Sequence, residues 1–374
     1  MPRNVSRRSL LRLAGAGTLL AKFAPPLSSQ ELPEGAIKLP LSPIVPVNRR
    51  STVFLLKGEN RRKNVHDALM GIDGELRAAL NRKKSVLIKP NLTSITNQLA
   101  STHPDAVRGI LDYLAPWYKG PVVIAESASN NTNEGYHNFQ YTPLPKEYAS
   151  LNISLVDLNV EGLFEPVGVI NYDFHPELLR VAKRLVDPDA FIINPVIPKT
   201  HNAVVVTAAI KNIVVGGALR SAPKETTWSD KRKFHVGPHA QNYNMLLVAQ
   251  KMAPCWGATV VDGYEGMEGN GPVSGNPVPH RIALASLDYV AADRVTTELM
   301  GIDPKWVGYL QYCEQYGLGN YDISKIDVRG ETIASLKRNY QLHKDIDIHL
   351  QWMGPAGPKP VIVGSLRAHD AYEA

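Results

Sequence analysis

The stretch Ala190-Phe191-Ile192-Ile193-Asn194 is a short apolar run without a charged side chain. Runs of this kind recur along the chain, separated by longer segments that mix apolar and charged residues. Uncharged runs flanked by helices are typical of strands buried on both faces of a sheet. The pattern therefore predicts an α/β fold with a mainly parallel sheet flanked by helices, built as one lobe or as two closely packed lobes.

Outward from this run, the sequence predicts strands and helices in alternation. Further strands are expected at residues 53–56, 85–89, 122–125, 153–156, 258–261, 281–285 and 360–363. Helices are expected at residues 61–82, 104–118, 176–186, 241–252, 288–300 and 304–316. Residues 203–215 allow two interpretations, because Val204-Val205-Val206 favours a strand whereas Ala208-Ala209-Ile210 and the closing Gly216 favour a helix, which we prefer.

Residues 1–30 have the pattern of a twin-arginine export signal. Ser6-Arg7-Arg8-Ser9 precedes the mildly apolar run Leu13–Ala21, which is too short to span a bilayer as a helix. We therefore expect the twin-arginine translocation machinery to export the protein, for example to the periplasm, with no transmembrane span; a basic amphipathic N-terminal helix is the alternative. Residues 31–51 are proline-rich and predict an extended connector, which leaves residues 52–374 as a single α/β domain.

Charge and cysteine content exclude two classes of function. The chain has 41 Lys and Arg against 35 Asp and Glu, but five of the cations and none of the anions lie in residues 1–30, so the remainder is almost neutral. Nucleic-acid binding through a basic face is therefore not expected. Cys255 and Cys313 are the two cysteines, and no C-x-x-C occurs, so the chain cannot supply the four thiolates that an iron–sulfur cluster needs. One disulfide and two free buried thiols are both compatible with this pair.

Polar residues follow several of the predicted strands directly. These are Lys89-Pro90-Asn91, Glu126-Ser127, Asn194 to His201, and Asp262-Gly263. Ligands of open α/β sheets bind outside the carboxyl ends of the strands, so we expect these residues to gather on one edge. Taken singly, each could be a turn or a cap.

A group of cations lies close to the first run. Lys199 and Lys211 are twelve residues apart and lie beside apolar sequence, and Lys224 and His235 follow. Two like charges about 4 Å apart repel by about 4 kcal/mol at an effective dielectric of about 20, so a fold that brings such cations together favours an anion. The residues predict a site for a small anionic molecule. The alternatives are a helix C-terminal lysine at Lys211 and a solvated loop around Lys224.

The glycine-rich segment 263–275 could close over a ligand through backbone N–H groups at Gly269 and Gly271, or it could be a tight surface loop. It is not a P-loop, because Pro272-Val273 stands where Lys-Ser/Thr would be needed. No G-x-G-x-x-G opens a helix, and no G-x-S-x-G elbow occurs. Histidines and acids could build a metal site, but no H-x-x-x-H or H-E-x-x-H spacing supports one, so no metal ligand is predicted.

In combination, these blocks resemble the domain of unknown function 362 family. The resemblance rests on Lys89-Pro90-Asn91-Leu92, Lys199-Thr200-His201, Thr207 to Asn212 with Gly216, Lys224, His235, Asp262-Gly263, Gly269-Asn270-Gly271-Pro272, and Asp288 and Asp293 with Gly301. The family has no assigned activity. Many members also carry a ferredoxin-like cysteine-rich segment, which this chain lacks.

From these observations we expect a polar cleft that binds a small anion. We expect the protein to be an enzyme that performs acid–base or redox chemistry, and the sequence does not identify its cofactor. Lys89, Lys199 and Lys211 would hold carboxylate or phosphate groups, His201 and His235 would act as acid–base partners, and Asp262 with Glu268 would orient them. The remaining expected ligand-binding residues are Asn91, Thr207, Asn212, Lys224, Gly269 and Gly271. A periplasmic binding protein or a metal-loaded redox accessory protein without turnover is the alternative.

Overall fold

A computed structural model describes residues 37, 39–40, 47–220 and 229–354. The expected export signal, most of the connector, Lys224 and the strand expected at 360–363 lie outside the described residues. Cys255 and Cys313 are both buried free thiols. In the part of the chain that is described, no helix combines the length and the apolar character needed to cross a membrane.

The main sheet has eight strands in the order β14-β1-β13-β10-β7-β2-β3-β4. Only β13 runs against its neighbours, so the predicted mainly parallel α/β fold is confirmed. In chain order the strands are β1 Ser51–Lys57, β2 Ser85–Ile88, β3 Pro121–Glu126, β4 Asn152–Asp157, β7 Ala190–Val196, β10 Trp256–Gly263, β13 Ile282–Ser286 and β14 Ile326–Gly330.

Two small sheets accompany the main one. A four-stranded sheet has the order β12-β11-β8-β9, and a two-stranded sheet joins β5 and β6. Their strands are β5 Phe164–Ile170, β6 Pro176–Ala182, β8 Lys199–His201, β9 Val205–Thr207, β11 Gly266–Glu268 and β12 Asn276–Val278.

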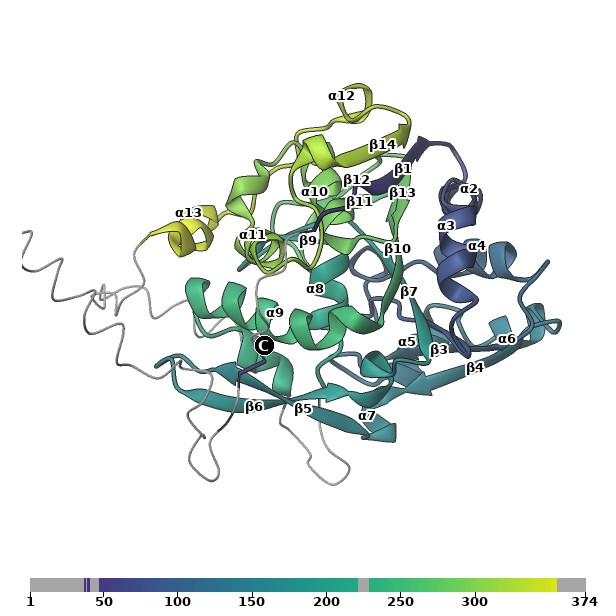
Figure 1. The fold of residues 1–374 in the computed structure, drawn as a ribbon, viewed down its shortest axis with the longest axis horizontal. Helices are drawn as coiled ribbons and strands as arrows, with labels where there is room; N and C mark the ends of the chain where they lie inside the picture. Colours follow the sequence, from purple (N-terminus) through teal and green to yellow (C-terminus); the bar gives the residue numbers. More distant parts are fainter. Residues whose placement is uncertain (1–36, 38, 41–46, 221–228, 355–374) are drawn as a thin grey trace, which may run out of the picture. The chain divides into compact units, whose positions relative to one another are not determined.

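Helices cover both faces of the main sheet (Figure 1). The longer helices are α2 Arg61–Met70, α3 Asp73–Leu80, α4 Pro104–Leu114, α8 Ala209–Val214, α9 Pro238–Met252, α10 Tyr289–Leu299 and α11 Gly308–Gln315. The short helices are α5 Thr132–Asn138, α6 Leu144–Glu147, α7 Leu158–Glu161, α12 Ile333–Leu336 and α13 Ile346–His349.

Alternate residues of one strand reach opposite cores, as strand geometry requires. Phe191 and Ile193 belong to the apolar cluster that contains α2, α3 and α4, whereas Ile192 belongs to the cluster that contains α8 and α9. The same alternation places Leu87 in the second cluster, between Val86 and Ile88 in the first. The short apolar runs are therefore uncharged because both of their faces are buried.

Four predicted elements differ from the structure. The helix expected at 304–316 divides into a 3-10 turn at Pro304–Trp306 and the helix α11, with Val307 extended between them. The helix expected at 61–82 is interrupted at Gly71, where a Cβ would lie 2.0 Å from the Phe54 ring. The helix expected at 176–186 was wrong: residues 176–182 form β6, paired with β5, and residues 183–186 form a 3-10 turn. Residues 203–215 contain both candidates, the strand β9 and then the helix α8.

Candidate functional site

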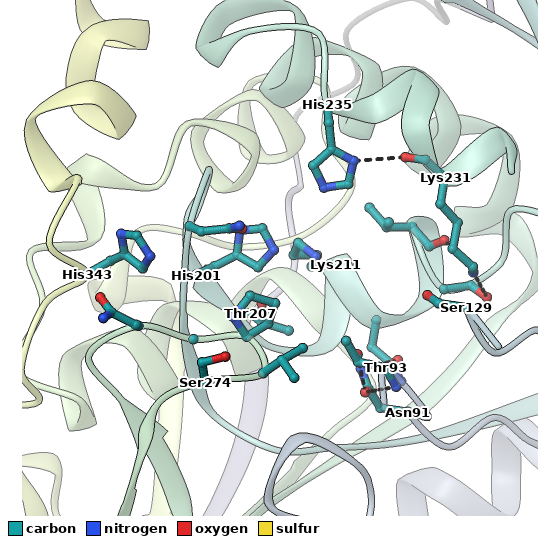
Figure 2. A pocket seen from close by; sticks show the side chains of 18 of the residues that line it. Asn91, Thr93, Ser129, His201, Thr207, Lys211, Lys231, His235, Ser274 and His343 are labelled. Carbon is teal, nitrogen blue, oxygen red and sulfur yellow. Dashed lines mark hydrogen bonds between the residues drawn. The ribbon is translucent and has the colours of Figure 1, made fainter. Parts of the chain in front are cut away.

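A cavity of about 730 Å³ lies beside α8 (Figure 2). The expected site residues that line it are Asn91, His201, Thr207, Lys211, Asn212, His235 and Gly271. Glu126 and Ser127, which the sequence placed at the same sheet edge, also line it. Residues that the sequence did not single out for the site complete much of the wall: Thr93, Ser129, Asn202, Lys231, Ser274, His343, Lys344 and Asp345. The structure thus brings residues from distant parts of the chain around one pocket.

The short helix α8 carries Lys211 and Asn212 to the cavity. Its first two backbone N–H groups, at Ala209 and Ile210, donate to the two carboxylate oxygens of Asp293 on α10, at 2.6 and 3.0 Å. Asp293 is fully buried, and burial raises its pKa to about 7. This carboxylate from another helix caps α8 where Ala208 supplies no side-chain cap, so it fixes the direction in which Lys211 leaves the helix.

Lys211 is buried in the cavity wall, and burial lowers the pKa of its amine to about 7. No described residue forms a hydrogen bond or ion pair with its Nζ atom. Its charge contributes to the low pKa values of Lys199, Lys231, His201 and His235, so Lys211 lies at the centre of the cationic group. A buried ammonium without a counter-ion is costly, and an anion in the cavity would remove that cost.

Lys231 is a second cation of the wall, on the 3-10 helix Asp230–Phe234. Its Nζ atom donates to Ser127 Oγ at 3.2 Å and to the carbonyl oxygens of Val215 and Gly216 at 3.1 and 3.2 Å. Burial lowers its pKa to about 7, while the Glu126 carboxylate acts in the opposite direction. Three acceptors hold this ammonium group in a fixed position.

The two expected catalytic histidines carry their protons on different nitrogens. His201 Nδ1 accepts from the backbone N–H groups of Ala203 and Val204 at 3.0 and 3.4 Å, so the neutral ring carries its proton on Nε2. His235 Nδ1 lies 3.0 Å from the carbonyl oxygen of Lys231, which can only accept, so its proton is on Nδ1. The rings are nearly parallel, with centroids 6.4 Å apart.

Both imidazoles are neutral at pH 7. Burial lowers the pKa of His235 to about 4, and burial together with the Lys211 charge lowers the pKa of His201 well below its ordinary value. The two neutral rings are therefore different tautomers, with the proton on Nε2 of His201 and on Nδ1 of His235. That is the complementary arrangement that proton transfer requires.

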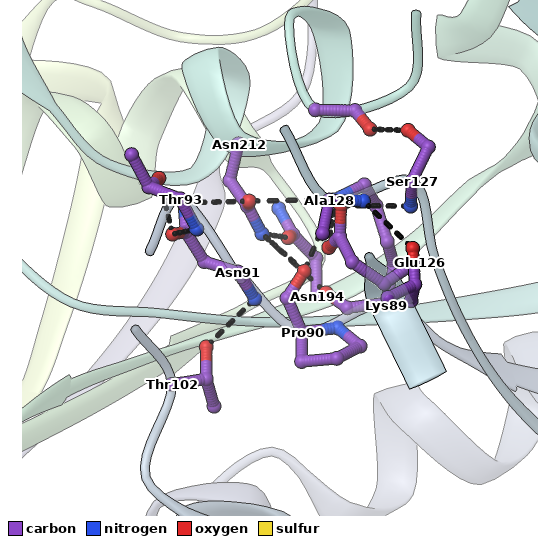
Figure 3. Close-up of polar contacts among 12 residues, drawn as sticks. Lys89, Pro90, Asn91, Thr93, Thr102, Glu126, Ser127, Ala128, Asn194 and Asn212 are labelled. Atoms are coloured by element: carbon purple, nitrogen blue, oxygen red, sulfur yellow. Dashed lines mark hydrogen bonds and ion pairs between the residues drawn. The ribbon is translucent and has the colours of Figure 1, made fainter. Parts of the chain in front are cut away.

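Lys89 lies beneath the cavity, next to its floor. Its Nζ atom is 2.7 Å from Glu126 Oε2, and both side chains are buried. Asn212 connects this ion pair to the wall: its Oδ1 accepts from Asn91 Nδ2 at 2.9 Å, and its Nδ2 donates to Asn194 Oδ1 at 2.7 Å (Figure 3). Lys89 is therefore occupied by Glu126 and is not available to an anion.

The other expected site residues lie away from the cavity. Lys199 donates to the Ala100 carbonyl oxygen at 2.7 Å. Asp262 pairs with Arg61 of α2 at 3.0 Å, because the strand alternation turns it to the same face as Val260. Glu268 Oε2 accepts from the Gln341 backbone N–H at 2.8 Å.

Gly269 is also absent from the lining, and its carbonyl oxygen accepts from Thr200 Oγ1. Gly271, two residues on, does line the cavity, where a Cβ would lie 2.1 Å from the Thr200 carbonyl oxygen. The close approach of two backbones explains why this wall position has no side chain.

Metal binding finds no support from the donor geometry. Among the described residues, no cluster of three or more His, Cys, Asp and Glu side chains could hold a metal ion. His201 and His343 both accept a backbone N–H at Nδ1, so in each neutral ring Nε2 carries a proton instead of a lone pair for a metal.

Comparisons with known proteins cover the region of the cavity. The family model described as "Domain of unknown function (DUF362)" matches residues 86–298. The thylakoid-associated protein sll1697 of Synechocystis sp. is 25% identical over 237 residues, which cover 62% of this chain and 68% of that protein. A crystal structure of a structural genomics target from Thermotoga maritima is 11% identical with a TM-score of 0.37, covering 57% of this chain and 52%, about half, of that chain.

Proposed function

The chain belongs to the DUF362 family, and we propose that it binds a small organic anion in this cavity and transfers a proton on it. The observation that carries the proposal is Lys211, a buried amine in the cavity wall that no described residue pairs with a carboxylate. Lys231 supplies a second cation to the same wall. Two cations in one wall favour an anionic ligand, because its charge offsets their mutual repulsion.

The histidine pair supports turnover over binding alone. The two neutral rings lie in one wall with their protons on different nitrogens, Nε2 of His201 and Nδ1 of His235, so together they can donate and accept a proton. Both rings stay neutral at pH 7, so they do not attract an anion through imidazolium charge. In this proposal Lys211 and Lys231 hold the anion, and Lys89, Lys199, Asp262 and Glu268 have structural roles.

Titration calorimetry with malonate, pyruvate, 2-oxoglutarate and phosphate tests the binding step. Because an anion favours the protonated form of Lys211, whose pKa is about 7, binding above pH 7 must be accompanied by proton uptake. We expect the Kd to rise about tenfold per pH unit above pH 7 for each lysine involved. If none of the four binds, or if the affinity does not change between pH 6.5 and 8.5, the proposal is wrong.

His201→Asn separates turnover from binding. Asn Oδ1 can accept from the Ala203 N–H as His201 Nδ1 does, but the variant has no counterpart of the Nε2 proton. We expect unchanged folding, a Kd within about tenfold of wild type, and loss of catalysed exchange of carbon-bound hydrogen of pyruvate or 2-oxoglutarate with D2O, followed by NMR. Should wild type itself show no exchange above the uncatalysed rate, the protein is a binding protein without turnover.

We also propose that residues 1–30 direct twin-arginine export of the folded protein. The support is the sequence pattern around Arg7-Arg8 and the following apolar run. Replacing both arginines by lysine keeps the charge but removes the paired guanidinium groups, so the full-length variant is expected to stay in the cytoplasm in cell fractionation. Export of that variant at the wild-type level would contradict the proposal.

A further inference from the structure

Burial lowers the pKa of three lysines to about 7, but their amine nitrogens differ in their hydrogen-bond partners. Lys199 donates to the Ala100 carbonyl oxygen and does not line the cavity. Lys231 lines the cavity but is held by three oxygen acceptors. Lys211 lines the cavity and has no hydrogen-bond partner among the described residues. Of the three, only Lys211 can turn its nitrogen toward a bound molecule without breaking an existing bond.

The surroundings of Lys211 favour the free amine. Burial is the cause of its lowered pKa, and about half of the molecules carry the neutral amine at pH 7. Lys199 and Lys231 are nearby cations, and the nearby imidazoles are neutral. A desolvated lysine next to another cation is one established way in which proteins make a lysine nucleophilic.

The wall also supplies hydrogen-bond donors for an oxygen atom at this position. Thr207 Oγ1 is buried and has no hydrogen-bond partner among the described residues, although Thr207 lines the cavity. His201 Nε2 carries a proton and has no acceptor among the described residues. A carbonyl oxygen next to Lys211 would satisfy one or both of these donors, and a buried donor without a partner is otherwise unfavourable.

We propose that Lys211 forms a Schiff base with the carbonyl carbon of a small oxo anion of the 2-oxo acid class. The inference rests on the proposed function, because the carboxylate of that ligand is the anion that the positive charge of Lys231 attracts, while the three hydrogen bonds of Lys231 stay in place. It adds the identity of the reacting group: the ligand must carry an aldehyde or ketone carbon beside its carboxylate.

The step is balanced without an oxidant or reductant. The Lys211 nitrogen lone pair attacks the carbonyl carbon, and the π electron pair moves to the oxygen, to which the N–H group of neutral His201 donates a hydrogen bond. One proton of the attacking nitrogen passes to this oxygen and gives the carbinolamine. The carbinolamine loses the oxygen as water when the second proton of the nitrogen reaches the leaving hydroxyl group. The net change is one C=O and one amine converted to one C=N and one water.

Reductive trapping tests the proposal. The full chain is incubated at pH 7 with pyruvate, glyoxylate or 2-oxoglutarate and sodium cyanoborohydride, and the adduct is located by peptide mass spectrometry. An exposed lysine of ordinary pKa is neutral in fewer than about one in a thousand molecules at pH 7. Labelling at Lys211 is therefore expected to exceed labelling at the exposed Lys84 by at least about a hundredfold, and malonate, which has no ketone or aldehyde carbon, should suppress it by competition.

Two variants distinguish the possible outcomes of this experiment. Lys211→Arg keeps a cation but no nucleophilic amine, so it should bind malonate and form no adduct, whereas Lys84→Arg should label as wild type does. Adducts spread over exposed lysines, or an adduct that persists in Lys211→Arg, would overturn the proposal. Calorimetric binding of pyruvate without any adduct would overturn the Schiff base but leave anion binding intact, and the absence of both binding and adduct would overturn both.

Discussion

Lys211→Met is expected to lose anion binding and at the same time to make the ligand-free protein more stable at neutral pH. Truncating one partner of a desolvated charge pair costs about 2–5 kcal/mol, so the Kd should rise by about thirtyfold or more. The gain in stability has a separate cause. Methionine has nearly the same volume, but its side chain is uncharged. Burying it therefore removes no water from a charged group.

The size of this stability change depends on pH. The pKa of Lys211 is about 7 in the folded protein and near its ordinary 10.5 in the unfolded chain, so between these values the unfolded chain binds more protons. The free energy of unfolding of wild type therefore contains a term that rises by about 1.4 kcal/mol per pH unit from pH 7 to 10.5, and this term is absent from Lys211→Met. The advantage of the variant should be large at pH 7 and small at pH 9.5.

Urea unfolding of both proteins at these two pH values, without ligand, measures the difference directly. Lys84→Met is the matched control, because the Lys84 side chain is 79% exposed. It should change neither binding nor the pH dependence of stability. A Lys211→Met variant that is less stable than wild type at pH 7 would show that the amine has a partner that compensates its burial.

Glu126→Gln is expected to destabilise the fold by about 3–5 kcal/mol, because it leaves the Lys89 ammonium buried without its carboxylate. Lys89 and Glu126 are 0% and 3% exposed at their side chains, and burial already lowers the pKa of Lys89 against the effect of Glu126. Gln keeps an acceptor for the Ser127 N–H, which Glu126 Oε1 now accepts at 2.9 Å. The variant therefore keeps this contact, removes the charge and places an NH2 donor in place of the oxygen that accepts from Lys89.

The double variant Lys89→Met, Glu126→Gln completes the test. Removing both charges should recover most of the lost stability, because no uncompensated ion remains in the interior. Urea unfolding at pH 7 for wild type, the two single variants and the double variant gives the coupling energy. A double variant as unstable as Glu126→Gln alone would mean that the cost comes from packing or hydrogen bonding and not from the buried charge.

Most of the main sheet could be predicted from the sequence because its strands are buried on both faces and so form uncharged runs. β2, β3, β7 and β10 all follow this rule. The rule fails where a strand belongs to a small, half-exposed ribbon. Residues 176–182 contain charged residues among apolar ones, which suggested a helix, although Leu179 and Val181 turn inward as alternate residues of a strand.

The site was predictable as a region and less so residue by residue. The position of a residue at the end of a strand places it at an edge of the sheet. The face of the sheet on which its side chain lies depends on the alternation of residues along the strand, and on β10 this alternation points Asp262 toward Arg61 of α2. Lys231 was overlooked because it lies in the charged run Asp230-Lys231-Arg232-Lys233, which has the appearance of a solvated loop. Its burial depends on acceptors contributed by Ser127, Val215 and Gly216, contacts that no local pattern encodes.

The cavity wall draws on residues from Asn91 to Ile348, so it forms only when nearly the whole described chain has folded. Loop-closure entropy makes contacts of such long sequence separation slow to form. Any molecule that binds there consequently acts by mass action on global folding, adding about 2.7 kcal/mol at a concentration one hundred times its Kd. A cell that lacked the ligand would hold a less stable, more readily proteolysed population, so the abundance of the protein would itself report the supply of its ligand.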